Sequence, residues 1–299
     1  MDFINVNWGF INLEREFINA HSPSGPPHHN EDNPKHREYE HMIKLFVSDL
    51  DGTLLEEDKQ VSEENQTYIK KLTEHGIEFA VATGRSDRDI VKLMEDMNVT
   101  GHRVSQNGAF VFNKGNEAIF SGTFDRSLIS DIHELIEAEY DFFFVSTATD
   151  LYVTKKTEEM RRAEEAHFFP LVENRDLINL YGKSVFPTKI SIVGDTERIL
   201  ELKKKVDNRF GPDIESYLSD EHCVDILPKG ISKASGIDHL LHLYNLKPEE
   251  IAVVGDSFND VPMMQMTPNS FAMSHARDEV KKHARHIVDH VHEAIRYFL

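Results

Sequence analysis

An α/β fold with a parallel sheet, interrupted by a second and smaller α+β domain, is predicted by this 299-residue sequence. The first observation is that apolar runs alternate with helix-length amphipathic segments from residue 42 onward, which is typical of βαβ units. The second is that this alternation changes between residues 124 and 221, a span of about 100 residues and a normal domain length. The third is that polar residues follow several of the apolar runs, and an open α/β sheet binds its ligands at that edge.

Composition excludes several classes of protein. The formal net charge of −19 argues against a binder of nucleic acid or of anionic membranes, because a phosphate backbone demands clustered Lys and Arg. The single cysteine, Cys223, excludes an intrachain disulfide framework and multi-cysteine zinc sites. No apolar run approaches the ~18–20 residues of a membrane span, and the N-terminus has no secretion-signal pattern. We therefore expect a cytoplasmic protein, either a monomer or a small homo-oligomer.

Residues 1–41 differ from the rest of the chain. They show no sustained strand-like alternation, and from residue 21 they are rich in Pro, His and charge, which leaves too little apolar surface for independent folding. We expect a flexible N-terminal extension, with the folded domain beginning at Met42. We expect the adjacent pair His28 and His29 to be solvated rather than bound to a metal.

Two parts of the chain, residues 42–123 and 222–299, carry the strand–helix alternation and form the predicted core domain. Apolar runs predict its strands, periodicity predicts its helices, and the Asn107-Gly108 turn predicts a hairpin. In the first part the predicted strands are 43–48, 77–82 and two short ones within 102–113, and the predicted helices are 63–75 and 87–97. In the second part the predicted strands are 224–227, 251–254, 270–273 and 286–288, and the predicted helices are 232–244, 276–284 and 292–298.

The intervening residues, 124–221, are predicted to form the inserted domain. Its predicted helices are 127–138, 158–166 and 196–209, and its predicted strands are 142–146, 151–154, 188–193 and 215–218. We expect its aromatic runs, 142–144 and 168–169, to fill the core of this domain rather than to form a ligand platform.

The stretch 46–55, FVSDLDGTLL, places two acids where the first strand would end. Residues two apart in a strand point to the same face, so Asp49 and Asp51 would begin by sharing one site. Gly52 lets the backbone bend and expose its own groups to a ligand. The alternative is an acidic Asp-Gly turn without a function, but the preceding apolar strand favours a site.

Two further elements supply groups suited to a phosphate. Thr83 and Gly84 follow the predicted strand 77–82, where they place a hydroxyl and a permissive backbone. Lys233 lies at a predicted helix start, with Ser232 as a suitable N-cap. The helix dipole disfavours a cation there unless an anion lies nearby. A Thr-Gly turn and a surface lysine are the ordinary alternatives.

The stretch GDSFND follows another apolar run and brings Asp256 and Asp260 close together, with Ser257 and Asn259 as neutral neighbours. Such a cluster is too costly to hold near two other aspartates without a cation. Mg²⁺ fits this site, because it takes few carboxylates and keeps waters and substrate oxygens in its octahedron. An Asx-rich turn without a metal is the alternative.

These residues together resemble the haloacid dehalogenase-like (HAD) hydrolases, specifically the Cof-type subfamily with a large inserted cap of class IIB. The four family motifs occur in order: DLDGT at 49–53, ATGR at 82–85, the lysine of GISK at 233 and GDSFND at 255–260. SQNGA at 105–109 is similar to the sequence before the cap in this subfamily, whereas SHA at 274–276 departs from the usual G/A-N-A. The resemblance covers residue 42 to the C-terminus and implies a Rossmann-like parallel-sheet core with an inserted α+β cap domain.

The resemblance also implies a mechanism, residue by residue. Asp49 would attack phosphorus and form an aspartyl-phosphate, and Asp51 would protonate the leaving alcohol and then deprotonate the hydrolytic water. Mg²⁺ would be held by Asp49, the backbone carbonyl of Asp51 and Asp256. The residues implied to bind the phosphate are Thr83, Gly84, Lys233 and Asn259, with Asp260 and Ser257 in supporting positions.

The implied function is a Mg²⁺-dependent phosphatase of small phosphate monoesters, such as a sugar phosphate, a nucleotide or a cofactor phosphate. A phosphomutase of the same fold stays open, because it differs mainly in what accepts the phosphoryl group. A phospho-receiver or metabolite sensor also needs an Asp, a Thr and a Lys around Mg²⁺, but receivers lack the second acid and a domain-sized insertion. The sequence does not name the substrate.

Overall fold

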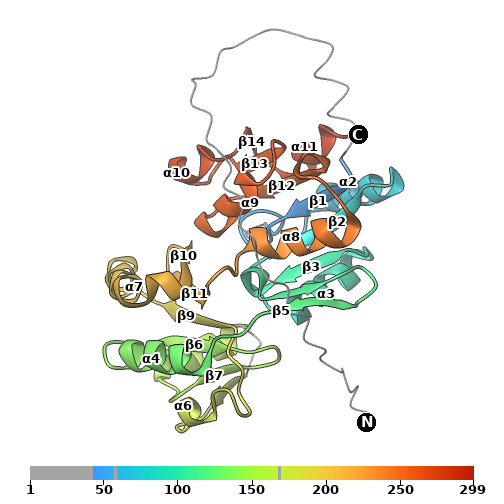
Figure 1. The fold of residues 1–299 in the computed structure, drawn as a ribbon. Coiled ribbons are helices and arrows are strands. Elements are labelled where there is room, and N and C mark those ends of the chain that lie inside the picture. Colours follow the sequence, from blue (N-terminus) through green and yellow to red (C-terminus); the bar gives the residue numbers. More distant parts are fainter. Residues whose placement is uncertain (1–42, 57–58, 168–169) are drawn as a thin grey trace.

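The computed structural model describes residues 43–56, 59–167 and 170–299. The predicted N-terminal extension, with His28 and His29, lies outside the described residues, and so does the aromatic pair 168–169. The described chain forms two domains, a larger core and a smaller cap (Figure 1).

The core is built on an eight-stranded sheet in the order β14-β13-β12-β1-β2-β3-β4-β5. The six strands from β14 to β3 are parallel, and β4 and β5 are antiparallel additions at one edge. Their bounds are β1 Leu45–Ser48, β2 Glu78–Ala82, β3 His102–Ser105, β4 Phe110–Phe112, β5 Ala118–Ser121, β12 Ile251–Gly255, β13 Ser270–Met273 and β14 His286–Val288. Strand β1 therefore lies in the interior of the sheet, between β12 and β2.

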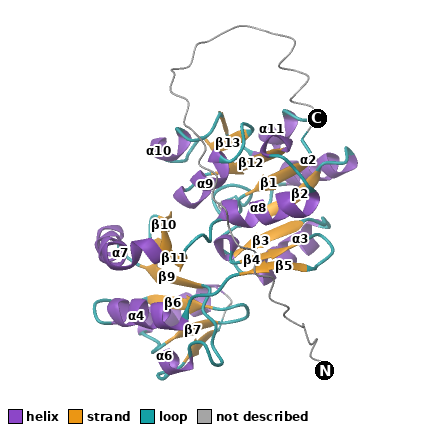
Figure 2. Cartoon of the chain, viewed as in Figure 1, coloured by secondary structure: helices purple, strands orange, loops and turns teal. Residues whose placement is uncertain are grey.

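Helices cover both faces of this sheet (Figure 2). Alternation along β1 explains why both faces are apolar: Phe46 packs into the core on one face, whereas Leu45 and Val47 pack into the core on the other. The helices of the first face are α2 Glu63–Glu74, α3 Asp87–Met97 and α11 Val291–Arg296, and those of the second are α8 Lys233–Tyr244, α9 Val261–Gln265 and α10 Asp278–Lys281. Short 3₁₀ turns are η1 Gln106–Gly108, η3 Pro248–Glu250 and η4 Phe258–Asp260.

The cap is built on a six-stranded, mainly antiparallel sheet in the order β10-β11-β9-β6-β7-β8. Its strands are β6 Phe143–Ser146, β7 Leu151–Val153, β8 Leu171–Glu173, β9 Lys189–Val193, β10 Ile214–Asp220 and β11 Cys223–Pro228. Its helices are α4 Arg126–Glu137, α5 Glu158–His167, α6 Leu177–Leu180 and α7 Thr196–Phe210, followed by the 3₁₀ turn η2 Gly211–Asp213. Phe143 is buried in the cap core, as expected for an aromatic run that serves packing.

The placement of strand 224–227 in the core domain is wrong. This strand, β11, pairs with β10 and β9 in the cap sheet, so the cap extends to Pro228 rather than to residue 221. The physical reason is that β10 and β11 follow each other closely and form an antiparallel hairpin, in which Leu218 lies opposite Val224. The core series resumes only at α8.

The other predicted elements agree in type with the structure, except that 276–284 contains only the four-residue helix α10. The elements that the prediction missed are short: β5, β8, α6 and α9 have three to five residues each. Segments of this length are too short to show a periodicity. Strand β5 is also an edge strand with exposed ends.

Candidate active site

The carboxyl end of β1 places the two aspartates in different surroundings. Asp49 continues the ladder, because its backbone N–H donates to the Val254 carbonyl at 2.9 Å, and its side chain is only 6% exposed. Asp51 lies beyond the strand, and its side chain is 43% exposed. The two acids reach one cleft, but they do not share one environment.

Gly52 makes possible the turn that follows Asp51. Its φ of +76° lies in the left-handed region, which a side chain strongly disfavours. A Cβ at this position would also lie 2.6 Å from Asp256 Oδ2. Glycine therefore allows the first loop to approach the acid loop after β12, and Thr53 Oγ1 fastens the two by donating to Asp256 Oδ1 at 2.9 Å.

Arg85 holds the Asp51 carboxylate in a bidentate ion pair. Nε donates to Oδ2 at 2.6 Å and Nη2 donates to Oδ1 at 2.5 Å. Burial raises the pKa of Asp51, but the hydrogen bonds and charge of Arg85 outweigh it, so this pKa lies below its ordinary value. Asp51 therefore carries a negative charge that is compensated at the rim of the cleft.

Three other carboxylates form a buried cluster. Asp49, Asp256 and Asp260 each offer an oxygen atom, and these atoms all lie within 4.8 Å of one another. Burial and the charge of Asp260 raise the pKa of both Asp49 and Asp256. Anionic groups held so closely in a buried site favour a cation beside them. The donor set, which consists of carboxylate oxygens alone, fits a hard divalent cation such as Mg²⁺.

Lys233 is the first residue of α8 and is 1% exposed. Its Nζ donates to Asp49 Oδ1 at 2.5 Å and to Asp260 Oδ1 at 2.6 Å. Burial lowers the pKa of Lys233, but the charges of the two carboxylates outweigh it and raise this pKa above its ordinary value. The nearby anions explain why a lysine occurs at a helix start, where the dipole disfavours it.

The predicted supporting residues lie in the loop after β12. The other oxygen of Asp260, Oδ2, accepts hydrogen bonds from the backbone N–H groups of Asp256 and Ser257, each at 2.9 Å. Ser257 also reaches the cap, because its Oγ donates to the Ser219 carbonyl of β10 at 3.1 Å. Asp260 therefore shapes the acid loop and positions Lys233 at the same time.

The remaining predicted residues also border the cleft. Thr83 is buried directly after β2, and its Oγ1 accepts a hydrogen bond from the backbone N–H of Arg85 at 3.2 Å. The Gly84 carbonyl accepts from Lys189 Nζ of the cap at 3.0 Å. Asn259 is buried and donates through Nδ2 to Asn107 Oδ1 at 3.1 Å. Every site residue predicted from the sequence thus lies at or beside one cleft.

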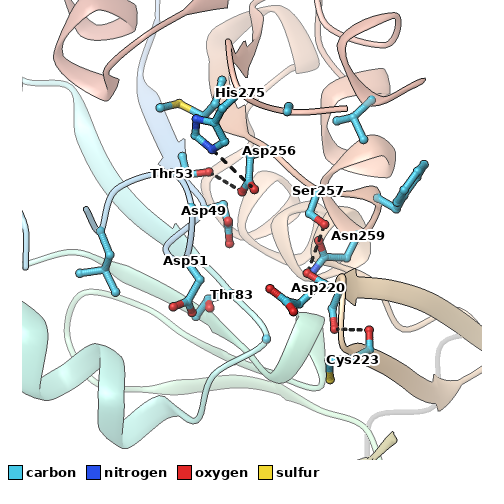
Figure 3. Close-up of a pocket in the computed structure, with 18 of the residues that line it drawn as sticks. Asp49, Asp51, Thr53, Thr83, Asp220, Cys223, Asp256, Ser257, Asn259 and His275 are labelled. Atoms are coloured by element: carbon cyan, nitrogen blue, oxygen red, sulfur yellow. Dashed lines mark hydrogen bonds and ion pairs between the residues drawn. The ribbon is translucent and has the colours of Figure 1, made fainter. Parts of the chain in front are cut away.

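The cleft lies between the core and the cap and has a volume of about 1180 Å³. Figure 3 shows Asp49, Asp51 and Asp256 on its core side and Asp220 and Cys223 on its cap side. The cap wall is polar, and the cap residues that border the cleft are Lys189, Leu218, Ser219, Asp220, Glu221, Cys223 and Asp225.

Sequence reasoning missed several residues of this site. Arg85 belongs to the ATGR motif, so its position beside the acids was available as a signal. His275 follows β13 in the divergent SHA sequence and lies at the cleft, with its Nε2 4.0 Å from Asp256 Oδ2 (Figure 3). Lys189 and Asp225 come from cap strands whose sequences carry no recognisable motif.

Comparison with known proteins gives the family. A family model described as haloacid dehalogenase-like hydrolase matches residues 46–299. The chain belongs to this family. Phosphatase YwpJ of Bacillus subtilis (strain 168) is 27% identical to this HAD-like hydrolase over 266 residues, covering 80% of the chain and 92% of YwpJ. The 5-amino-6-(5-phospho-D-ribitylamino)uracil phosphatase YbjI of Escherichia coli (strain K12) is 25% identical over 249 residues, covering 82% and 90%.

The crystal structure of TM0651 from Thermotoga maritima is similar to this HAD-like hydrolase with a TM-score of 0.73 at 26% identity, covering 86% of this chain and 96% of that one. The predicted resemblance to Cof-type HAD hydrolases and the predicted core-and-cap fold are confirmed. In the part of the chain that the structure describes, no helix has the length and apolar character of a membrane span.

Proposed function

We propose that this HAD-like hydrolase is a Mg²⁺-dependent phosphatase of small phosphate monoesters that works through an aspartyl-phosphate on Asp49. The observation that carries the proposal is the setting of Asp49: it is buried at the end of β1, paired with Lys233 and clustered with Asp256 and Asp260. A carboxylate in such a setting favours a bound metal ion beside it, and it has an anion-binding lysine within reach. This is what attack on a phosphate requires.

In the proposed first step, one carboxylate oxygen of Asp49 attacks phosphorus and the bond from phosphorus to the ester oxygen breaks. Lys233 Nζ lies 2.5 Å from Asp49 Oδ1 and can offer its charge to the phosphoryl oxygens as the new bond forms. Thr83, Gly84 and Asn259 border the same region and are proposed to complete the phosphate site. Asp260 and Ser257 support it through the acid loop.

Asp51 is proposed as the general acid and base. In its protonated form it would give a proton to the leaving alcohol, and it would then take a proton from the water that hydrolyses the aspartyl-phosphate, so the protonated form is restored after each turnover. Its position supports this role, because the carboxylate lies at the rim of the cleft, beside the space that a leaving group would enter. Arg85 keeps Asp51 ionised in this structure, so the role requires this ion pair to open and Asp51 to take up a proton when the substrate binds.

The proposed metal site consists of the Asp49 and Asp256 carboxylates and the backbone carbonyl of Asp51. Bound Mg²⁺ would offset the repulsion between an anionic nucleophile and an anionic phosphate. The close carboxylates and the raised pKa values of Asp49 and Asp256 support a cation at this place.

The proposed substrates are small phosphorylated metabolites. A cleft of about 1180 Å³ with a polar cap wall suits a small hydrophilic leaving group. The name of YbjI states that it acts on a phosphate ester of a ribityl compound. The formal charge of −19 supports a free metabolite rather than a phosphate within nucleic acid.

The test is hydrolysis of p-nitrophenyl phosphate by the purified protein. We expect activity with Mg²⁺, loss of activity after chelation, and no activity in Asp49→Asn. In Asp51→Asn we expect slow turnover and accumulation of acid-stable phosphoenzyme. Full activity in Asp49→Asn would contradict the assignment of the nucleophile. Transfer of the phosphoryl group to a second sugar hydroxyl, without release of phosphate, would instead indicate a phosphomutase.

A further inference from the structure

A chain of hydrogen bonds leads from the cap into the catalytic loop, which is the acid loop that follows β12 and contains η4. It begins at Asp225 on β11, continues through Asn107 in the turn after β3, and ends at Asn259 in η4. Asn107 Nδ2 donates to Asp225 Oδ2 at 2.8 Å, and Asn259 Nδ2 donates to Asn107 Oδ1 at 3.1 Å. The three residues are 2%, 0% and 5% exposed, so water does not compete for these bonds.

The direction of this chain follows from the chemistry of its groups. A carboxylate only accepts hydrogen bonds, whereas an amide has a donor end and an acceptor end. Asp225 accepts from Asn107, and so Asn107 turns its nitrogen toward the cap and its oxygen toward Asn259. That oxygen in turn accepts from the nitrogen of Asn259. The carboxylate in the cap thus sets the orientation of an amide in the catalytic loop.

Asp225 is itself held firmly in the cap. Ser191 Oγ donates to its Oδ1 at 2.6 Å, and Lys189 Nζ lies 3.1 Å from the same oxygen. Lys189 also donates to the Gly84 carbonyl at 3.0 Å, which ties the pair to the proposed phosphate-binding loop. Asp225 therefore has a fixed position relative to the core whenever the cap is docked.

Asn107 is held equally firmly in the core. Its φ of +55° lies in the left-handed region, which Asn tolerates better than most residues. Its backbone N–H donates to the Thr83 carbonyl at 2.8 Å. The next residue, Gly108, lies so close to α8 that a Cβ there would meet the Ser232 carbonyl at 2.1 Å. The left-handed backbone conformation of Asn107 stores some strain, and such strain is typical of functional positions.

The last residue of this series of hydrogen bonds, Asn259, indicates a ligand. Asn259 Oδ1 is buried and has no hydrogen-bond partner among the described residues. A buried acceptor without a donor is costly, and native proteins keep one where a ligand or a water satisfies it. Asn259 lines the cleft between the two domains. Its unpaired oxygen is therefore available to a hydrogen-bond donor in the substrate complex.

We propose that Asp225 and Asn107 are positioning residues, through which the docked cap orients the Asn259 amide so that its oxygen receives a donor of the substrate complex. The inference rests on the proposed phosphatase function and adds a link between the cap and a side chain of the active site. It predicts that the catalytic loop is completed only when Asp225 is in place, so a substrate that prevents docking of the cap is bound but turned over slowly.

The first test is a double-mutant cycle on kcat and KM, with p-nitrophenyl phosphate and Mg²⁺ as probe. We expect Asn107→Gly, which removes the amide and tolerates the positive φ, to lower kcat by about 10-fold to 100-fold, because misplaced groups cost this much, and to change KM less. In an Asn259→Ala background we expect Asn107→Gly to have no further effect on kcat. Asp225→Asn keeps an acceptor oxygen for Asn107, so it should lower kcat less than the Asn107 substitution does. Ser216→Ala, which removes a hydrogen bond to Asp207 elsewhere in the cap, is the matched control with near-normal kcat.

The inference would be overturned if the kcat losses of the two single variants multiplied in the double variant, or if the substitutions changed KM alone. Either result would leave the phosphatase proposal intact. A second measurement does not depend on catalysis. In protein labelled with ¹⁵N at asparagine, the side-chain amide signals that disappear in Asn259→Ala identify Asn259. We expect these signals to shift in Asp225→Asn and not in Ser216→Ala. Unshifted signals in Asp225→Asn would refute the link, even if wild-type protein failed to hydrolyse the probe and the proposed function fell.

Discussion

The buried charges of the core and those of the cap are balanced differently. In the core, Lys233 contacts Asp49 and Asp260 while Asp256 adds a third carboxylate, so the cluster carries an excess of negative charge. In the cap, Lys189 and Asp225 form a pair of equal and opposite charges.

This difference separates a site for ligands from a structural contact. The balanced pair in the cap needs no further ion, and Ser191 and Asn107 satisfy its carboxylate further. The unbalanced cluster in the core is costly unless an ion joins it, and perturbed carboxylates in a cleft are typical of functional sites. Each prediction below changes one side of this comparison.

The largest effect is expected from Lys233→Met. It leaves Asp49 and Asp260 buried without their ammonium partner, and removing one member of a buried pair costs about 3–5 kcal/mol. We also expect phosphatase activity to fall by at least about 10²-fold, because a group that stabilises the transition-state charge is lost. Thermal unfolding and initial rates measure the two effects. A stable variant with normal rates would mean that the core cluster needs no cation.

The next effect is stabilisation by Mg²⁺ and its dependence on pH. The pKa values of Asp49 and Asp256 are raised in the folded protein, so protons compete with the metal. Without metal, folded-state stability falls as pH rises from the ordinary carboxyl pKa through these raised values, because the clustered charges then repel. We therefore expect Mg²⁺ to raise the unfolding temperature more at neutral pH than at acidic pH.

Asp256→Asn is the matched variant for this experiment. It removes one carboxylate charge but keeps the shape of the side chain and an oxygen for Thr53. We expect it to be at least as stable as wild type without metal, and to gain little from Mg²⁺. An equal gain from Mg²⁺ in both proteins would place the metal elsewhere.

A smaller effect is expected from Arg85→Gln, which removes the bidentate partner of Asp51. If Arg85 positions the general acid, a substrate with a poor leaving group should suffer most, because only that group needs a proton as it departs. We expect the rate to fall about 10-fold for an alkyl phosphate, and less for p-nitrophenyl phosphate. Equal losses for both substrates would assign Arg85 to phosphate binding instead.

The smallest effect is expected from Lys189→Met in the cap. Asp225 loses its ion-pair partner but keeps hydrogen bonds from Ser191 and Asn107, so we expect a cost of about 1–3 kcal/mol. Because Lys189 also bridges to Gly84, docking of the cap should weaken, and kcat should fall more than KM rises. Losses of stability and activity as large as those of Lys233→Met would remove the distinction between the core cluster and the cap pair.

The sequence by itself determined the family and most of the core, and it led to the proposed reaction chemistry. The chemistry-bearing residues Asp49, Thr83 and Asp256 each follow an apolar strand, and parallel strands bring their carboxyl ends to one edge whatever the details of packing. Lys233 is an exception, because it begins α8 after the cap strand β11, and only the folded structure places it beside Asp49. The positions of the other three residues follow from local pattern, because each preceding strand is long and apolar enough to be recognised.

Only the tertiary structure decided how the cap meets this site. Whether strand 223–228 belonged to the core or to the cap depended on its pairing with β9 and β10, which its own sequence does not encode. Asn107 and Asp225 lie 118 positions apart in the chain, and no local signal joins them. Strand pairing and buried hydrogen bonds are non-local, so the link from cap to catalytic loop emerges only when the chain is folded.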